Sequence, residues 1–160
     1  MTPGIHAARA ARIAYTVHEY VHDPAHPSYG EEAAEKLGVP MARVFKTLVA
    51  RLDGRTLAVG VVPVSAKLDM KRLAKAAGAK RAEMAAPSDV ERTTGYVLGG
   101  VSPLGQKRRL QTWIDASAAH YPTILVSAGR RGLEIELAPD DLRMLTGGAF
   151  AAIAQSDAPA

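Results

Sequence analysis

The stretch Arg43–Val64 has the sequence RVFKTLVARLDGRTLAVGVVPV and carries the clearest fold signal in the chain. Its two apolar segments, Arg43–Leu52 and Arg55–Val64, flank the dipeptide Asp53-Gly54. Asp-Gly between two such segments favours a tight two-residue turn, because both turn positions need positive φ angles that Asp and Gly tolerate. The stretch therefore predicts two antiparallel strands joined as a hairpin.

A lysine lies in the middle of the first of these strands. Side chains alternate between the two faces of a strand, so Lys46 shares a face with Val44 and Leu48, while Thr47 points to the other face. Lysine is rarely fully buried without a partner. Two interpretations follow: Lys46 lies on an exposed edge, or it reaches into a pocket that needs a positive charge.

Turn and capping signals on both sides of the hairpin predict the other elements. Helices are expected where a capping residue or proline opens a segment, at 2–11, 28–37, 69–78, 87–93, 117–120 and 139–145, with a last helical stretch at 149–155. Further strands are expected at 15–20, 80–84, 111–115, 123–127 and 133–137. Hairpins mixed with scattered helices predict an α+β fold with an antiparallel or mixed sheet.

Length and composition indicate one globular domain spanning 1–160. No apolar run approaches the length of about 20 residues that crosses a bilayer, and the N-terminus lacks the apolar core of a signal peptide. The chain has no cysteine, which excludes disulfides and a thiol nucleophile of its own. These features predict a cytoplasmic protein. A net charge of +4 weakly favours polyanionic partners.

A glycine-rich segment is the second candidate for a binding site. It spans Thr94–Arg109 and has the sequence TGYVLGGVSPLGQKRR. Glycine lets the backbone approach a ligand closely and point N–H groups at it. The cations Lys107, Arg108 and Arg109 follow directly, as suits an anion such as phosphate. The alternative is a plain connecting loop that ends in a solvated run of charge.

Other common chemical motifs do not occur. His18, His22 and His26 recur every four residues, which on a helix would suggest metal ligands, but Pro24 and Pro27 exclude a continuous helix there. There is neither a Gly-x-Ser-x-Gly nucleophile turn nor a Walker A loop. The sequence therefore predicts no metal and no cofactor, and it offers no histidine-activated nucleophile.

Short segments in a fixed order give the chain a family resemblance: Phe45–Leu48, Leu68-Asp69, Gly78–Lys80, Thr94–Tyr96, Gly99–Lys107, Val126-Ser127 and Arg131–Leu137. In these segments the chain resembles the YbaK/EbsC family of aminoacyl-tRNA deacylases, relatives of the editing domain inserted in bacterial prolyl-tRNA synthetases. Within that family it is most similar to the Cys-tRNA(Pro) deacylases. The resemblance implies a mixed, barrel-like sheet with helices packed outside.

The resemblance also implies an activity: removal of cysteine from mischarged Cys-tRNA(Pro). In such enzymes the cysteine thiol of the substrate attacks its own ester, so no protein nucleophile is needed. A chain of 160 residues has little room to read a tRNA, so prolyl-tRNA synthetase is the expected partner. Two alternatives remain: a deacylase for another mischarged tRNA such as Ala-tRNA(Pro), and a non-catalytic module that binds tRNA or a nucleotide.

Candidate catalytic residues come from both stretches. The family resemblance implies that Lys46 matters most for activity, and its ammonium can anchor phosphate or ribose oxygens of the terminal adenosine. Backbone N–H groups around Gly99, Gly100 and Ser102 can stabilise the oxyanion that forms during ester cleavage. The alternative for Lys46 is a purely structural role.

The pocket wall is expected to include other positions that match the family: Tyr20, Tyr29, Thr47, Ser127 and Glu134. Tyr29 stands where relatives often have phenylalanine. Glu134 stands where the most similar relatives carry aspartate, and one extra methylene can shift the preference for the amino acid. A regular strand points Thr47 away from Lys46, so its place in the pocket wall rests on the family match and not on strand alternation.

Overall fold

The predicted hairpin forms the centre of the molecule. The structure is a computed structural model that describes residues 1–26 and 29–156. Strands β2 (Phe45–Leu52) and β3 (Thr56–Pro63) pair antiparallel, with Phe45 opposite Pro63 and Leu52 opposite Thr56. Asp53 and Gly54 have φ angles of 51° and 67°. Both turn positions are therefore left-handed, as the Asp-Gly signal predicts.

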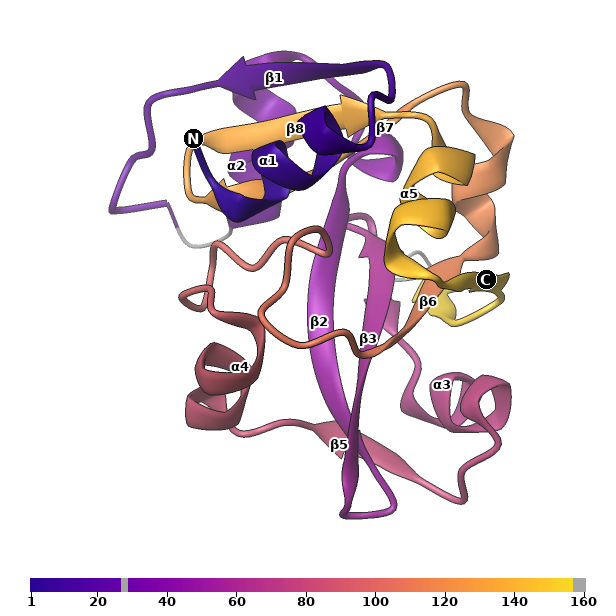
Figure 1. Ribbon diagram of the computed structural model, residues 1–160. Helices are drawn as coiled ribbons and strands as arrows, with labels where there is room; N and C mark the ends of the chain where they lie inside the picture. Colours follow the sequence, from indigo (N-terminus) through magenta and orange to yellow (C-terminus); the bar gives the residue numbers. More distant parts are fainter. Residues whose placement is uncertain (27–28, 157–160) are drawn as a thin grey trace.

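Three further strands complete the main sheet, in the order β5-β2-β3-β6-β9 (Figure 1). They are β5 (Ala82–Met84), β6 (Gln111–Asp115) and β9 (Ala149–Ala151). Strand β5 pairs antiparallel with β2, whereas β6 runs parallel to β3, and β9 runs parallel to β6. The sheet is thus mixed, as predicted.

A second sheet, in the order β1-β8-β7, packs beside the first. It contains β1 (Tyr15–Glu19), β8 (Leu133–Leu137) and β7 (Ile124–Arg130), all antiparallel. A parallel bridge between Val44 and Leu125 connects this sheet to the start of β2. The two sheets consequently wrap around a shared interior. A small third pair joins β4 (Ala66–Leu68) to β10 (Ala154–Ser156).

In the described part of the chain, five α-helices surround the sheets: α1 (Pro3–Ala10), α2 (Tyr29–Leu37), α3 (Met70–Ala77), α4 (Pro87–Thr94) and α5 (Pro139–Thr146), with 3₁₀ turns at Met41–Arg43 and Ala116–His120. The predicted caps of α1 and α3 are confirmed. Thr2 Oγ1 accepts a hydrogen bond from Ile5 N, and the Asp69 carboxylate accepts one from Arg72 N. Ser28, the predicted cap of α2, lies outside the described residues. No helix in the described part of the chain is long and apolar enough to cross a membrane.

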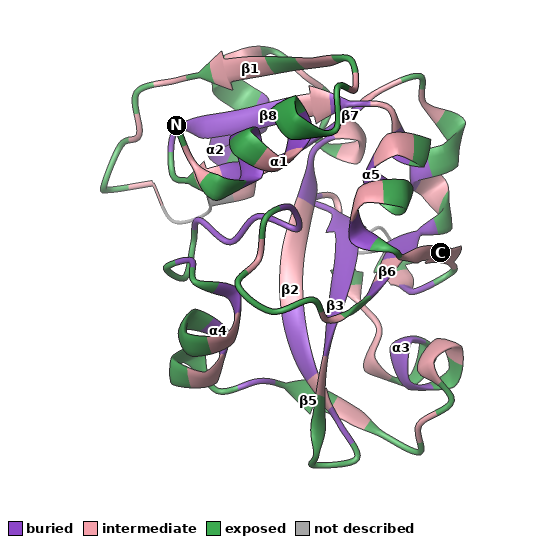
Figure 2. Ribbon diagram, viewed as in Figure 1, coloured by how far each residue is buried: buried purple, intermediate pink, exposed green. Residues whose placement is uncertain are grey.

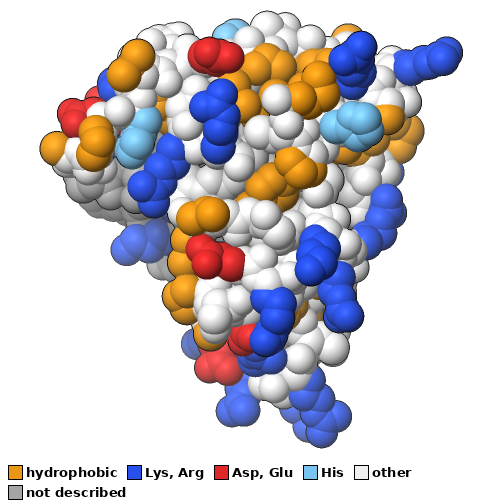
Figure 3. Space-filling view, turned by 60° about the vertical axis from the view of Figure 1, so that its left-hand side comes forward, with side chains coloured by type: hydrophobic (Ala, Val, Ile, Leu, Met, Phe, Trp, Pro, Cys, Tyr) orange, Lys and Arg blue, Asp and Glu red, His pale blue; other side chains and the backbone are white. Residues whose placement is uncertain are grey.

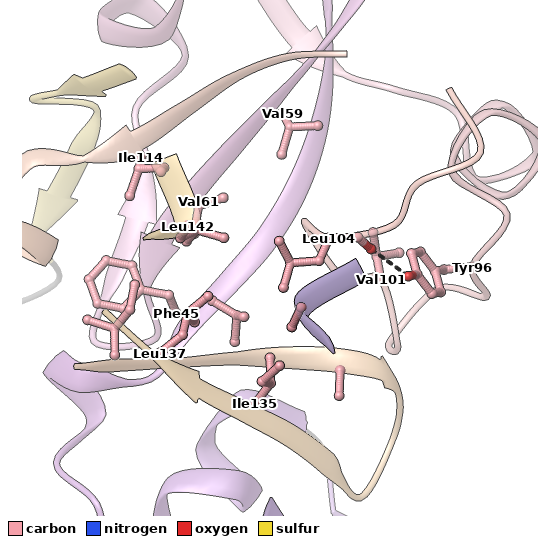
Figure 4. Packing of buried hydrophobic residues seen from close by; sticks show 14 of the residues in the cluster. Phe45, Val59, Val61, Tyr96, Val101, Leu104, Ile114, Ile135, Leu137 and Leu142 are labelled. Atoms are coloured by element: carbon pink, nitrogen blue, oxygen red, sulfur yellow. Dashed lines mark hydrogen bonds between the residues drawn. The ribbon is translucent and has the colours of Figure 1, made fainter. Parts of the chain in front are cut away.

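The core lies between the two sheets (Figures 2 and 4). The hairpin contributes Phe45, Val59 and Val61, and β8 contributes Ile135 and Leu137, all almost completely buried. A separate cluster lies on the other face of the hairpin, where α3 covers it. Strand β3 is buried on both faces, which explains its nearly continuous apolar sequence.

The prediction of a last helical stretch at 149–155 is wrong. Gly147, with a φ of 65°, ends α5, and the chain then forms β9 and β10. Between these strands the Asp115 carboxylate accepts hydrogen bonds from Ile153 N and Ala154 N at 3.1 and 2.9 Å. The alanine-rich segment favours a helix by local propensity, but pairing with distant residues overrides that propensity. No local signal in the segment indicates these contacts.

Candidate active site

A cavity of about 340 Å³ lies where the start of β2, the β7-β8 pair and the loop after α4 meet. Two lining residues, Tyr20 and Gly30, lie after β1 and within α2. The other lining residues come from β2, from the loop after α4 and from the β7–β8 pair: Phe45, Lys46, Thr47, Leu48, Leu98, Gly99, Val101, Ser127, Arg130, Arg131 and Glu134. Lys46, Gly99, Tyr20, Thr47, Ser127 and Glu134 are predicted site residues that the fold brings together here. Tyr29 begins α2, but its side chain lies outside the described part of the chain.

The cavity follows the edge of β2. Strand β5 pairs with β2 only from Ala50 to Leu52, which leaves the first half of β2 uncovered on that side. Four consecutive residues from Phe45 to Leu48 line the cavity, so it runs along the strand edge, where the backbone lies between the two side-chain faces. Alternation therefore does not separate Lys46 from Thr47. Thr47 Oγ1 is buried with no hydrogen-bond partner among the described residues, which makes it an unsatisfied polar atom beside the cavity.

The opposite wall comes from a cross-strand pair. Ser127 on β7 lies opposite Glu134 on β8, and Ser127 Oγ accepts a hydrogen bond from Gly129 N at 3.1 Å. The pairing register shifts between Ser127 and Arg130. This bulge gives β7 an extra bend before the turn, as bulges do beside functional sites.

Glu134 is a buried acid in this wall. Its side chain is only 7% exposed, and its carboxyl group forms no hydrogen bond or ion pair with the described residues. Burial raises the pKa of Glu134 to about 8, because the charged form loses its hydration. At neutral pH the group is mainly a carboxylic acid, which can both donate and accept a hydrogen bond. Burial first, and then the charge of Glu134, raise the pKa of Tyr20 to about 12, so Tyr20 keeps its proton.

Replacing Glu134 with glutamine should change how stability depends on pH. In the unfolded chain the carboxyl group has its ordinary pKa of 4.5, whereas burial raises the pKa to about 8 in the folded protein. Unfolding in this window releases a proton, so rising pH destabilises the wild type. Thermal unfolding at pH 5 and pH 8 should therefore show Glu134→Gln gaining stability relative to the wild type as pH rises. A constant difference would contradict a buried, protonated Glu134.

The glycine-rich segment is a folded wall and not a plain connection. Tyr96 OH donates to Leu104 O at 2.5 Å (Figure 4). Ser102 Oγ accepts a hydrogen bond from Leu104 N at 3.2 Å. Gly99, with a φ of 88°, lines the cavity. Gly100 and Ser102 are buried behind it and do not line the cavity. Of the three predicted loop residues, only Gly99 can present its backbone to a ligand directly.

Comparisons with known proteins agree with this arrangement. The aminoacyl-tRNA editing domain family matches residues 23–145. The chain belongs to this family. EbsC of Enterococcus faecalis, named as a candidate Cys-tRNA(Pro)/Cys-tRNA(Cys) deacylase, is 44% identical over 142 residues, which cover 89% of this chain and 86% of EbsC.

Two other relatives place the domain in context. A proline–tRNA ligase of Pelotomaculum thermopropionicum is 30% identical over 74% of this chain, but over only 22% of the ligase. The crystal structure of a candidate trans-editing enzyme for prolyl-tRNA synthetase superposes with a TM-score of 0.83, at 24% identity and with 96% of both chains covered. The fold of this chain is therefore the editing-domain fold. All the cavity residues except Tyr20 fall within the matched segment 23–145.

The cations at the cavity of this editing domain differ from those predicted. Lys107, Arg108 and Arg109 follow the glycine-rich loop, but none of them lines the cavity. Arg130 and Arg131 line it instead, beside Lys46. This arginine pair lies between the predicted strands 123–127 and 133–137 and was not among the predicted site residues. The signal that could have identified it is its position close behind Ser127, a predicted pocket residue at the end of a strand.

The three histidines considered above as metal ligands form separate ion pairs. His18 pairs with Glu136 at 2.8 Å, His22 with Glu32 at 2.6 Å, and His26 with Glu35 at 3.3 Å. Glu32 is completely buried, and hydrogen bonds from His22, Asp23 N and Lys36 outweigh its burial, lowering its pKa to about 2. These contacts attach the loop after β1 to α2. The described residues contain no group of three or more His, Cys, Asp or Glu that could hold a metal ion.

Proposed function

We propose that this editing domain removes cysteine from Cys-tRNA(Pro) in trans, with the substrate thiol as the attacking group. The observation that supports this most is the composition of the cavity. It combines three cations with a buried acid, while its described lining contains no cysteine and no histidine to activate a nucleophile. The 44% identity to EbsC, whose name includes Cys-tRNA(Pro) deacylase, supports the same substrate.

The proposed chemistry needs no atom from the protein. The cysteine sulfur attacks the carbonyl carbon of its own ester, forming an S–C bond and breaking the C–O bond to the ribose. The thiol proton ends on the released ribose oxygen. The product is a cyclic thiolactone, which water then opens to free cysteine. The task of the protein is to fold the aminoacyl group into the reactive geometry and to stabilise the oxyanion.

The cavity residues divide this task. Lys46 provides an ammonium group that anchors phosphate or ribose oxygens of the terminal adenosine, and Arg130 and Arg131 add positive charge from the β7 side of the cavity. The backbone N–H of Gly99 is the candidate donor to the oxyanion. Thr47 Oγ1 and the acid Glu134 provide polar contacts for the aminoacyl group. Burial raises the pKa of Glu134 to about 8, so at neutral pH this acid offsets little of the positive charge of the three cations.

A synthetase that selects proline needs a second, hydrolytic site, because its first binding pocket cannot fully exclude cysteine. Cysteine is close to proline in size, and a binding pocket separates such similar side chains by only about 1–3 kcal/mol. Selection of the tRNA is then provided by prolyl-tRNA synthetase, which we propose as the partner. The similarity to a segment of a proline–tRNA ligase supports this link.

The experiment is to measure release of the amino acid from Cys-tRNA(Pro), Ala-tRNA(Pro), Ser-tRNA(Pro) and Pro-tRNA(Pro), with and without prolyl-tRNA synthetase. We expect fast release from the cysteinyl substrate alone, because serine has nearly the same shape but lacks the nucleophilic thiol. Release of alanine would identify a different mischarged substrate. No release from any substrate, with the synthetase present, would favour a non-catalytic tRNA-binding module.

A further inference from the structure

All the excess positive charge of the chain lies in one short segment. The whole chain has 20 Lys and Arg residues against 16 Asp and Glu, a net charge of +4. Segment 67–81 alone carries a net charge of +5, so the remainder of the chain is slightly negative. Its cations are Lys67, Lys71, Arg72, Lys75, Lys80 and Arg81, and its one acid is Asp69. These six cations are called the α3 face below.

The packing of α3 turns these cations outward. Leu73 and Ala74 are buried beneath the helix, whereas all six cations are exposed. One of the six, Arg72, lies 3.7 Å from the carboxylate of Asp69, which also caps α3. Asp53 in the β2–β3 turn accepts the backbone N–H groups of residues 80 and 81, both at 3.0 Å. The cations therefore face solvent at the narrow end of the molecule, where Lys and Arg side chains also project around the β2–β3 turn (Figures 1 and 3).

The α3 face begins next to the candidate active site. Leu48 lines the cavity and also packs against the cluster that contains Leu73 of α3. Met70, the first residue of α3, packs against the same cluster. The helix is about 12 Å long, at about 1.5 Å per residue. The chain after α3 reaches the β2–β3 turn, where Asp53 accepts the N–H groups of residues 80 and 81, and then pairs with the end of β2 as β5. The α3 face thus extends from beside Leu48 toward the end of β2 that is remote from Lys46.

We propose that the α3 face binds phosphate groups of the tRNA acceptor stem while the aminoacyl end occupies the cavity; the inference rests on the proposed function. Lysine clusters attract nucleic-acid phosphates independently of sequence. Segment 67–81 has no Phe, Tyr or Trp on which unpaired bases could stack. The surface therefore fits the backbone of a duplex better than a single strand. The acceptor stem is the duplex joined directly to the aminoacylated end.

The test neutralises Lys71 and Lys75, one helical turn apart and both exposed. We expect Lys71→Gln/Lys75→Gln to raise the Kd for a labelled tRNA(Pro) transcript, and the KM for Cys-tRNA(Pro), by about tenfold at low salt. The slope of log Kd against log salt should fall by about one for each lysine. Deacylation of the cysteinyl ester of adenosine, which has no phosphate, should be unchanged. An acceptor-stem minihelix should show the same loss as the full tRNA.

The matched control is Arg9→Gln/Arg12→Gln, which removes the same charge from exposed positions in and just after α1. Equal weakening by the control would show a general charge effect and overturn the proposal. So would an unchanged Kd and salt slope in Lys71→Gln/Lys75→Gln, or a loss of synthetase binding with tRNA binding intact. If the wild type deacylates neither substrate, the proposed function fails, while Kd and salt slope still decide this inference.

Discussion

Replacing Lys46 with alanine is expected to lower kcat/KM for deacylation of Cys-tRNA(Pro) by about 100-fold or more without unfolding the protein. Lys46 lines the cavity on the uncovered half of β2, and its side chain is only partly buried. Its removal takes away an ammonium group that positions the terminal adenosine. Displacement of the ester by as little as about 1 Å is enough to cost about two orders of magnitude in rate. Single-turnover deacylation with enzyme in excess measures the loss.

Two further variants test this assignment: the first keeps the charge at position 46 and changes the shape of the side chain, and the second removes a lysine elsewhere as a control. Lys46→Arg keeps the positive charge but replaces a compact ammonium with a planar fork, so partial recovery is expected. Lys107→Ala removes an exposed lysine that does not line the cavity, and should leave the rate unchanged. Full activity in Lys46→Ala, with the thermal unfolding midpoint preserved, would refute the assignment of this cavity as the active site.

The fold was most predictable where the signals are local. The turn Asp53-Gly54 and the caps Thr2 and Asp69 were predicted from a few adjacent residues, because each depends on φ angles or hydrogen bonds within a single turn. Segment 149–155 was predicted wrongly, because Asp115, about 38 positions earlier in the chain, binds its backbone. A contact at such a separation leaves no periodic trace in either segment.

In the candidate site, too, the sequence identified some residues, whereas others depend on long-range packing that only the structure shows. The family resemblance named Lys46 and Glu134, but strand alternation alone would have separated Lys46 from Thr47. The structure unites them because β5 leaves the edge of β2 uncovered, which no pattern within β2 encodes. Arg130 and Arg131 were missed because their role depends on the β7 bulge and on the loop packed against it.

Substitution of Gly100 with valine is the second change with a large expected effect. A Cβ atom at position 100 would lie 2.9 Å from Arg130 Cα and 3.3 Å from Arg130 C, so the clash is with backbone that a side-chain rotation cannot relieve. The φ angle of Gly100 is not in the left-handed range, which leaves steric exclusion as the reason for glycine. Overpacking of this kind costs about 1–3 kcal/mol of stability.

The clash also bears on the cavity, because Gly100 lies between two wall residues, Gly99 and Val101, and contacts a third, Arg130. Pushing the loop away from β7 should therefore lower kcat/KM by about 100-fold, beyond what the loss of stability explains. Gly38→Ala is the matched control: its φ of 67° makes alanine unfavourable, but nothing lies within 4 Å of the added Cβ. It should destabilise the protein and leave the activity of the folded fraction unchanged. If Gly100→Val destabilises no more than this control and deacylates at the wild-type rate, the loop does not form the wall of the active site.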